Sequence, residues 1–255
     1  NYRINGRTNT KLLSFHESKI KAYQTATHSL IQTIPQVSSL IKAYKNRLAI
    51  VVSNVVKVYL FDDATATYLY EDDLVPVEVV SSIDAIDIYD NLIVFSSSVD
   101  EGVWVFEYDT AWTQLQAKIT ATGGTGTPLF GSSVALVGDT LAVGAPGDNT
   151  NYGAVFVFTR SGTFAQSAKL VSVLTGLGCL LGCSVIISNN FIVAGARGVS
   201  SNRGAISLFV KKYNTWSVYT NEIFGSGTVA GDNFGRYLSL GYDKESNMFI
   251  TAGGS

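Results

Sequence analysis

The sequence predicts an all-β fold made of repeated four-stranded units, and three observations lead to this prediction. The 255 residues include 24 Gly, 13 Tyr and 13 Phe but only 4 Pro, and such a mixture favours strands and tight turns. Hydrophobic residues make up 46% of the chain and charged residues 15%, so the chain has enough apolar surface to bury a core. The third observation is an internal repeat, which decides the architecture.

The repeat is a short apolar segment that ends in small residues. Its five copies follow one another at spacings of 44, 49, 50 and 58 residues. They begin at Leu48, Leu92, Leu141, Phe191 and Phe249. Because a nearly continuous apolar run is typical of a strand buried on both faces, we expect each copy to be the second strand of one unit.

Further strand-like segments surround each copy. One lies before it, as in residues 83–89, and short turns that contain Asn, Asp or Gly predict a hairpin between the two. After four of the five copies comes a strand that ends in an apolar residue and Phe, such as Val157-Phe158, followed by a more polar strand. Four antiparallel strands per unit are typical of the blades of a β-propeller.

The repeat divides residues 1–255, taken as one domain, into five blades. Four of them are expected near residues 37–73, 80–119, 130–170 and 181–223. The fifth copy, in residues 234–255, lacks a third and a fourth strand, whereas residues 1–29 offer two strands without a first and a second. We therefore expect the two ends to form one blade, in which the strand from Phe249 pairs with residues 11–15 and closes the ring. The alternative is that the chain is part of a six- or seven-bladed ring.

Two short motifs in the third blade connect the repeat with a known family. Phe130-Gly131 precedes its first strand, and Gly144-Ala145-Pro146 ends its second strand. These motifs resemble the FG-GAP repeat of integrin α-subunit propellers, and Phe234-Gly235 keeps the first motif in the last blade. The resemblance implies a propeller at the cell surface or outside the cell, as part of a larger precursor, whose loops bind other proteins.

The resemblance also raises the question of calcium. Many members of the family hold this ion with alternating Asp and Asn oxygens between the first two strands of a blade. The corresponding loops here are short: Gly138-Asp139-Thr140 has a single carboxylate, and residues 243–247 alternate oxygen donors out of register. The run Asp148-Asn149-Thr150-Asn151 lies in the next loop, where Asx residues usually shape a turn. We therefore expect no metal and no other cofactor.

The sequence argues against an enzyme. Its only histidines, His16 and His28, lie in polar N-terminal segments expected to form outer strands, so neither suits a general base. A five-bladed glycoside hydrolase is the alternative, but that class needs carboxylates that converge on the channel. Asp84 and Asp87 lie three residues apart in one predicted inner strand and should point to opposite faces, which leaves only loop acids such as Asp232.

Cysteine chemistry is open. Cys179 and Cys183 are the only two cysteines, so disulfides are not the framework of the fold, and both a local disulfide and two free thiols remain open. Cys183 stands where the third blade has a serine and has no predicted partner base, which favours a small buried apolar side chain over a nucleophile.

Without catalytic groups, the predicted function is that of a binding or structural module whose rigid strands present loops on one rim. The loops after the second strands and the links between blades form this rim. Its candidate partner-binding residues are Asp148, Asn149, Tyr152, Arg197 and Arg203. Tyr and Arg are frequent anchors at interfaces, and the expected partner is a protein or another subunit of an extracellular assembly. A lectin-like propeller that binds glycans is the alternative, although no sugar pocket repeats from blade to blade.

The charge pattern and the hydropathy exclude two further classes of partner. The 20 acidic and 18 basic residues are scattered and give a net charge of -2, so no basic stripe is available for nucleic acid. No segment reaches the roughly 18 consecutive apolar residues that span a bilayer. Adhesion and structural assembly both remain open as roles.

Overall fold

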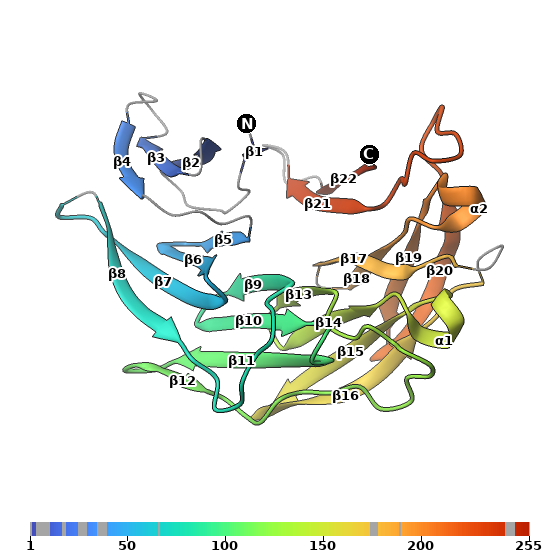
Figure 1. Ribbon diagram of the computed structural model, residues 1–255, viewed down its shortest axis with the longest axis horizontal. Coiled ribbons are helices and arrows are strands. Elements are labelled where there is room, and N and C mark those ends of the chain that lie inside the picture. The colour runs from blue at the N-terminus through green and yellow to red at the C-terminus, as the bar shows by residue number, and fades with distance from the viewer. Residues whose placement is uncertain are drawn as a thin grey trace.

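The computed structural model shows an all-β chain whose sheets follow one another in sequence order (Figure 1). It describes residues 2–3, 11–16, 19–24, 30–34, 40–65, 67–173, 178–188, 190–242 and 248–254. Within these residues, five sheets have four antiparallel strands each and a sixth sheet has two. We number the sheets I to VI along the chain.

The strands of the six sheets have the following bounds. Sheet I comprises β1 (Tyr2–Arg3), β2 (Lys11–His16), β3 (Lys19–Gln24) and β4 (Leu30–Ile34). Sheet II comprises β5 (Ile41–Tyr44), β6 (Arg47–Val52), β7 (Val55–Asp62) and β8 (Thr67–Leu74). Sheet III comprises β9 (Ala85–Tyr89), β10 (Leu92–Ser97), β11 (Gly102–Tyr108) and β12 (Trp112–Gln114).

The second half of the chain repeats this order. Sheet IV comprises β13 (Ser133–Val137), β14 (Thr140–Ala145), β15 (Ala154–Ser161) and β16 (Thr163–Leu170). Sheet V comprises β17 (Leu181–Ser188), β18 (Phe191–Ala196), β19 (Ala205–Lys212) and β20 (Thr215–Ile223). Sheet VI comprises β21 (Tyr237–Tyr242) and β22 (Met248–Gly253). Two single helical turns, α1 (Asp148–Asn151) and α2 (Val199–Asn202), follow β14 and β18.

Sheets II to V are arranged as the blades of a propeller. In each of them the first strand lies innermost and the last strand lies at the periphery (Figure 1). The innermost strands contact each other from sheet to sheet: β5 contacts β9, β9 contacts β13, β13 contacts β17 and β17 contacts β21. Repeated four-stranded sheets around a common centre form a β-propeller, which confirms the predicted all-β propeller of four-stranded blades but not the predicted number of five blades.

The core lies between the sheets. All six residues of β10 are buried, because Leu92 packs toward sheet IV while Ile93 packs toward sheet II. In β14, Leu141 packs toward sheet III and Ala142 toward sheet V. Burial on both faces explains why these second strands are continuous apolar runs, as the sequence analysis predicts for the repeated segment.

The glycines of the two motifs meet where one sheet docks on the next. Gly182, which stands in sheet V where Gly131 stands in sheet IV, has a φ of +90°, and this conformation favours glycine. Its carbonyl oxygen accepts a hydrogen bond of 2.8 Å from Ser133 Oγ of sheet IV. A Cβ atom at Gly144 would lie only 1.9 Å from the same oxygen. The contact recurs between sheets V and VI, so the motifs mark a joint between blades.

The described strands do not form the predicted blade from the two ends of the chain. β2, which contains residues 11–15, lies between β1 and β3. β22 pairs with β21, and no other described strand lies beside it. The sequence analysis assigned residues 30–34 to no strand, although as β4 they complete sheet I around β2 and β3. With its own partners on both sides, β2 is not available to β22, and the predicted pairing of the two ends is not found among the described strands.

Candidate partner-binding rim

The predicted rim consists of the loops that join second to third strands and of the links between sheets. Because neighbouring strands are antiparallel, these segments lie at the same edge of their sheets. The two longest such loops contain α1 and α2, which lie on the same side of the molecule (Figure 1). We call the exposed residues 149–151 and 200–202 of these two turns the turn surface.

Each turn holds three successive residues other than glycine in the left-handed region. Their φ values are 49°, 56° and 67° in α1 and 52°, 59° and 63° in α2. The six residues are Asn149, Thr150, Asn151, Ser200, Ser201 and Asn202. Asn is tolerated in this conformation, whereas Thr150, Ser200 and Ser201 adopt it at a cost of about 1–2 kcal/mol each, so the surrounding structure must hold the turns in place.

Backbone hydrogen bonds to the links on both sides hold the turns. In α1, Asn149 N donates to Thr125 O at 3.1 Å, and Leu180 N donates to Asn151 O at 2.9 Å. At the second turn, Gly198 N, just before α2, donates to Cys179 O of the preceding link at 3.0 Å, and Asn233 N of the following link donates to Asn202 O at 2.7 Å. Hydrogen bonds to the neighbouring links therefore fix both turns, and the exposed side chains of the turn surface stand on a fixed backbone.

Asp148 does not belong to the exposed part of the rim. Its side chain is fully buried, and its Oδ1 accepts a hydrogen bond of 2.7 Å from Thr125 N. Its Oδ2 lies 2.7 Å from Lys169 Nζ, which also donates to Gly123 O at 2.7 Å. The carboxylate thus ties α1 to the preceding link and to β16. Asp148 was predicted as a partner-binding residue, but its side chain is not at the surface, because it is buried in an ion pair with Lys169.

The other predicted residues differ in how far they reach solvent. Asn149 is exposed, and Arg197 is half-buried. Tyr152 packs against the core between sheets IV and V. Arg203 places its guanidinium carbon 4.3 Å from the centroid of the Phe224 ring and donates from Nε to Thr228 Oγ1 at 3.0 Å. Tyr152 and Arg203 therefore support the rim with much of their side chains.

The sequence analysis placed both loops in the predicted rim but named only Asn149 of the turn surface as a candidate residue. The residues that it did not name singly are Thr150, Asn151, Ser200, Ser201 and Asn202. A signal for them exists, because Asn-Thr-Asn and Ser-Ser-Asn each end two residues before a glycine and recur at a spacing of 51 residues. Small polar residues before glycine are typical of turns with positive φ.

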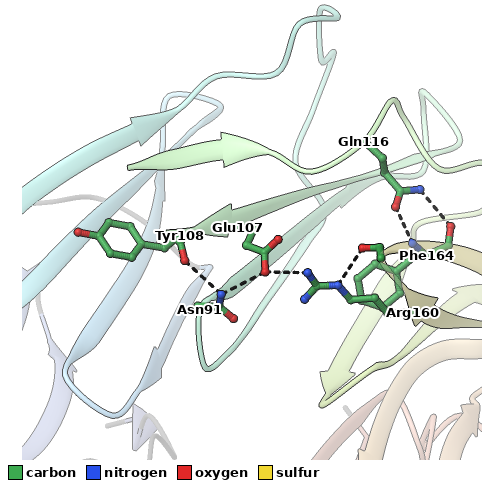
Figure 2. A network of polar contacts seen from close by, with 7 residues as sticks. Asn91, Glu107, Tyr108, Gln116, Arg160 and Phe164 are labelled. Carbon is green, nitrogen blue, oxygen red and sulfur yellow. Dashed lines mark hydrogen bonds and ion pairs between the residues drawn. The ribbon is translucent and has the colours of Figure 1, made fainter. Parts of the chain in front are cut away.

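The opposite edge of sheets III and IV carries a polar network. Figure 2 shows Glu107 Oε1 between two donors, Asn91 Nδ2 at 3.1 Å and Arg160 Nη2 at 2.7 Å. Gln116 bonds the backbone of Phe164 in both directions, at 2.6 and 3.1 Å. These contacts join the outer strands of two neighbouring sheets, so the polar groups in the network are used by the fold.

A second cluster joins sheets II and III in a similar way. Glu71 receives two hydrogen bonds of 3.1 Å from the Arg47 guanidinium. It also accepts one of 3.1 Å from Trp112 Nε1. The guanidinium carbon lies 4.1 Å from the centroid of the Tyr108 ring. Bidentate pairing and stacking of this kind are suited to an arginine in a partly buried joint.

The acids of the predicted inner strand also serve the fold. Asp84 Oδ2 accepts a hydrogen bond of 2.7 Å from Ser98 N. Asp87 accepts one of 2.8 Å from Leu136 N of the next sheet and lies 3.4 Å from Lys42 Nζ of the preceding sheet. In the part of the chain that the structure describes, no group of three or more His, Cys, Asp or Glu residues could hold a metal ion.

The two cysteines are poorly suited to act as nucleophiles. Cys179 and Cys183 are free thiols, and burial raises the pKa of both, which disfavours the nucleophilic thiolate. His16 ends β2, whereas His28 and residues 243–247 lie outside the described residues.

None of the described helices has the length and apolar character needed to cross a membrane.

The comparison with family models decides which repeat the chain carries. Residues 112–158 match the FG-GAP repeat, and this segment includes the first motif glycine, Gly131, and the second, Gly144. The chain contains an FG-GAP repeat. The matched segment begins with β12 and runs through the first three strands of sheet IV. A comparison with curated proteins finds no match.

Solved structures with the same arrangement are β-propellers at low sequence identity. The structure of U3-55K has a TM-score of 0.64 and 16% identity over 98% of this chain and 72% of that chain. The WD40 repeats of RRP9 have a TM-score of 0.63 and 16% identity over 98% and 71% of the two chains. Hsv2 from Kluyveromyces lactis has a TM-score of 0.59 and 10% identity over 97% and 69%. At these identities the similarity shows the fold alone.

Proposed function

We propose that this chain is a non-enzymatic binding module that contacts protein partners through its rim, with the turn surface of α1 and α2 at the centre of the contact. The observation that carries the proposal is the six exposed side chains on left-handed backbone. Glycine would form these turns without strain. Turn formation accounts for the Asn residues but does not require Thr150, Ser200 or Ser201, whereas presentation of side chains on a fixed backbone suits recognition.

The chemistry of the turn surface favours a polar protein contact. Its six residues are Asn, Thr and Ser, which form adaptable hydrogen bonds without carrying charge. The half-buried Arg197 and Arg203 flank α2 and add donors at its ends. Together with the FG-GAP repeat, these features support a cell-surface or extracellular module in a larger precursor, which acts in adhesion or assembly as one propeller unit over residues 1–255.

Replacement by glycine tests the proposal without damage to the fold. The two triple variants are N149G/T150G/N151G and S200G/S201G/N202G, and each removes side chains while glycine keeps the left-handed backbone. We expect both variants to fold at least as stably as the parent, because the strain is relieved. Partners cross-linked to the parent and identified by mass spectrometry should be lost from the variants, and purified partners should bind them at least about tenfold more weakly.

A matched control comes from another turn. Tyr213 and Asn214, in the hairpin between β19 and β20, are exposed and have φ values of 48° and 64°. The double variant Y213G/N214G makes the same kind of change at the other edge of sheet V and should keep the partner. Undiminished binding by both triple variants, or equal loss in the control, would contradict the proposed function.

A further inference from the structure

The link between sheets II and III exposes three valines at alternate positions. Val75, Val77 and Val79 are 68, 90 and 92% exposed, and we call them the valine strip. Single exposed apolar side chains are ordinary at a protein surface, whereas a group of neighbouring ones marks a contact site. The strip is separate from the turn surface, which belongs to sheets IV and V, and it goes beyond the proposed function.

Hydrogen bonds to sheet III fix the backbone that carries the strip. Val77 N donates to Gln114 Oε1 of β12 at 2.9 Å. Glu78 Oε2, between two of the valines, accepts a hydrogen bond of 3.1 Å from Trp104 Nε1 of β11. Because Glu78 is turned toward sheet III, the valines on either side of it are left to the solvent. A partner that binds them finds a surface that needs little ordering.

The loop between β10 and β11 enlarges this apolar surface. Ser81 of the link donates from N and Oγ to the two carboxylate oxygens of Asp100, at 2.7 and 2.6 Å. These bonds hold the loop against the link. Val99, the neighbour of Asp100 in the chain, is 70% exposed. Val99 therefore adds a fourth exposed valine beside the strip.

The charges around the strip are negative. Residues 75–84 and 98–101 contain four acids and no Lys or Arg. The acids are Glu78, Asp84, Asp100 and Glu101. Lys118 Nζ donates to the Asp100 carbonyl oxygen at 3.2 Å, so the charge of this lysine offsets them in part. Valines among carboxylates favour a partner with apolar and basic side chains, and they disfavour an anionic membrane or nucleic acid.

The link between sheets IV and V has valines at the corresponding positions without the acids. Val173 follows the last residue of β16 by three positions, as Val77 follows β8, and its N donates to Asn221 Oδ1 at 3.0 Å. Val171 and Val173 are 54 and 84% exposed. Residues 171–173 carry no charge. This link therefore separates the effect of exposed valines from the effect of the charges around them.

We propose that the valine strip, together with Val99, is a docking surface for a segment of a partner protein that combines apolar and basic side chains. The apolar side chains of the segment pack on the valines, and its basic side chains face the carboxylates of the link and the loop. Burial of apolar area supplies affinity, and charge complementarity selects the partner. The rim thus has a neutral polar surface on sheets IV and V and an apolar, acidic one on sheets II and III.

A labelled peptide of alternating valine and lysine is the probe for this surface. Its fluorescence anisotropy is measured against the whole chain, beside two control peptides. One control has Glu in place of each Lys, and the other has Ser in place of each Val. We expect saturable binding of the Val/Lys peptide only, and raised salt should weaken it several-fold because the charges are at the surface.

Variants of the chain locate the peptide. V77S/V79S removes two exposed apolar side chains, which the fold does not bury, and should weaken binding at least about fivefold. E78Q keeps an acceptor for Trp104 Nε1 but removes the charge, and should weaken binding by about two- to threefold. The matched control V171S/V173S makes the same change in the uncharged link and should bind the peptide as the parent does.

The turn-surface variants keep this proposal apart from the proposed function. N149G/T150G/N151G should bind the Val/Lys peptide as the parent does, so failure of the turn surface leaves the valine strip standing. Three results would overturn the docking surface: no saturable binding of the Val/Lys peptide, equal binding of either control peptide, or an equal loss of binding in V171S/V173S and V77S/V79S.

Discussion

Gly144 and Gly253 occupy corresponding positions in sheets IV and VI, yet their surroundings differ. Each lies opposite the residue two positions after a motif glycine, Ser133 in one case and Tyr237 in the other. The Gly182 carbonyl of the next sheet fills the space at Gly144, whereas no described residue lies within 4 Å of a Cβ built at Gly253. The need for glycine thus arises from the neighbouring blade and not from the strand itself.

This difference predicts opposite outcomes for one substitution. Gly144→Ala should lower the free energy of unfolding by about 1–3 kcal/mol, because the new methyl group forces sheets IV and V apart. Gly253→Ala should change it by less than about 0.5 kcal/mol. Urea unfolding followed by tryptophan fluorescence measures both. Equal effects of the two substitutions would show that the joint between blades is not at the motif glycines.

Lys169 makes the buried carboxylate of Asp148 tolerable. Removal of one partner from a buried ion pair leaves an uncompensated charge. Lys169→Met should therefore lower the free energy of unfolding by about 3 kcal/mol. Lys45→Met is the matched control, because Lys45 and Asp90 form a pair in which both side chains are more than half exposed, and such pairs contribute little. If thermal melts show the first variant to be as stable as the control, Asp148 is not held by this pair.

The sequence analysis predicted an exposed Asp148, although its side chain is buried, and the reason is physical. A carboxylate in a polar loop is usually exposed, and nothing in the local pattern indicates that a lysine 21 residues later reaches back to it. The motif glycines were easier to predict, because their spacing is visible in the sequence. Their role as contacts between blades depends on the Cβ positions of two sheets and became visible only in the structure.

At the scale of elements, the links between sheets determine the shape of the rim. Three fourth strands each carry an amide side chain that accepts a hydrogen bond from the preceding link, at 2.9, 2.8 and 3.0 Å. The acceptors are Gln114, Gln166 and Asn221. These side chains hold the links against the outer strands. Their spacings of 52 and 55 residues follow the repeat, yet an amide on an outer strand carries no signal of its partner.

The hydrogen bonds between Asp100 and the link before sheet III should make the stability of the fold depend on pH. Burial raises the pKa of Asp100, but hydrogen bonds from Ser81 Oγ and N, at 2.6 and 2.7 Å, outweigh it and hold the pKa below the ordinary value of 3.8. A carboxyl with a lowered pKa in the folded state stabilises the fold above its unfolded pKa, and this contribution is lost as the pH falls through the folded pKa. We therefore expect Asp100 to stabilise the link at neutral pH and to release it below about pH 4.

The variant Asp100→Asn tests this dependence. It should be less stable than the parent at pH 7, and the difference between the two should shrink as the pH falls below about 4. Thermal melts over this pH range provide the measurement. A constant difference at all pH values would mean that the carboxylate charge of Asp100 does not hold the link.

At the scale of the whole molecule, the structure is a series of sheets in which each sheet docks on the next and the last described sheet has two strands. The sequence predicted four-stranded units well in sheets II to V, because each second strand is buried on both faces and carries a distinctive pattern. It failed at the ends. Sheet I has a first strand of two residues, too short for a pattern, so β2 and β3 were assigned to the distant β22 instead.

Hydrogen–deuterium exchange tests this account most directly, through a comparison of Met248–Gly253 in β22 with Phe191–Ala196 in β18. The two strands have nearly the same sequence, but among the described strands β18 has neighbours on both sides and β22 has one. We predict that the outward-facing amides of β22 exchange at least about tenfold faster than their counterparts in β18. Equal protection of the two strands would contradict the account, because it would show that another strand already covers β22 and completes the last blade.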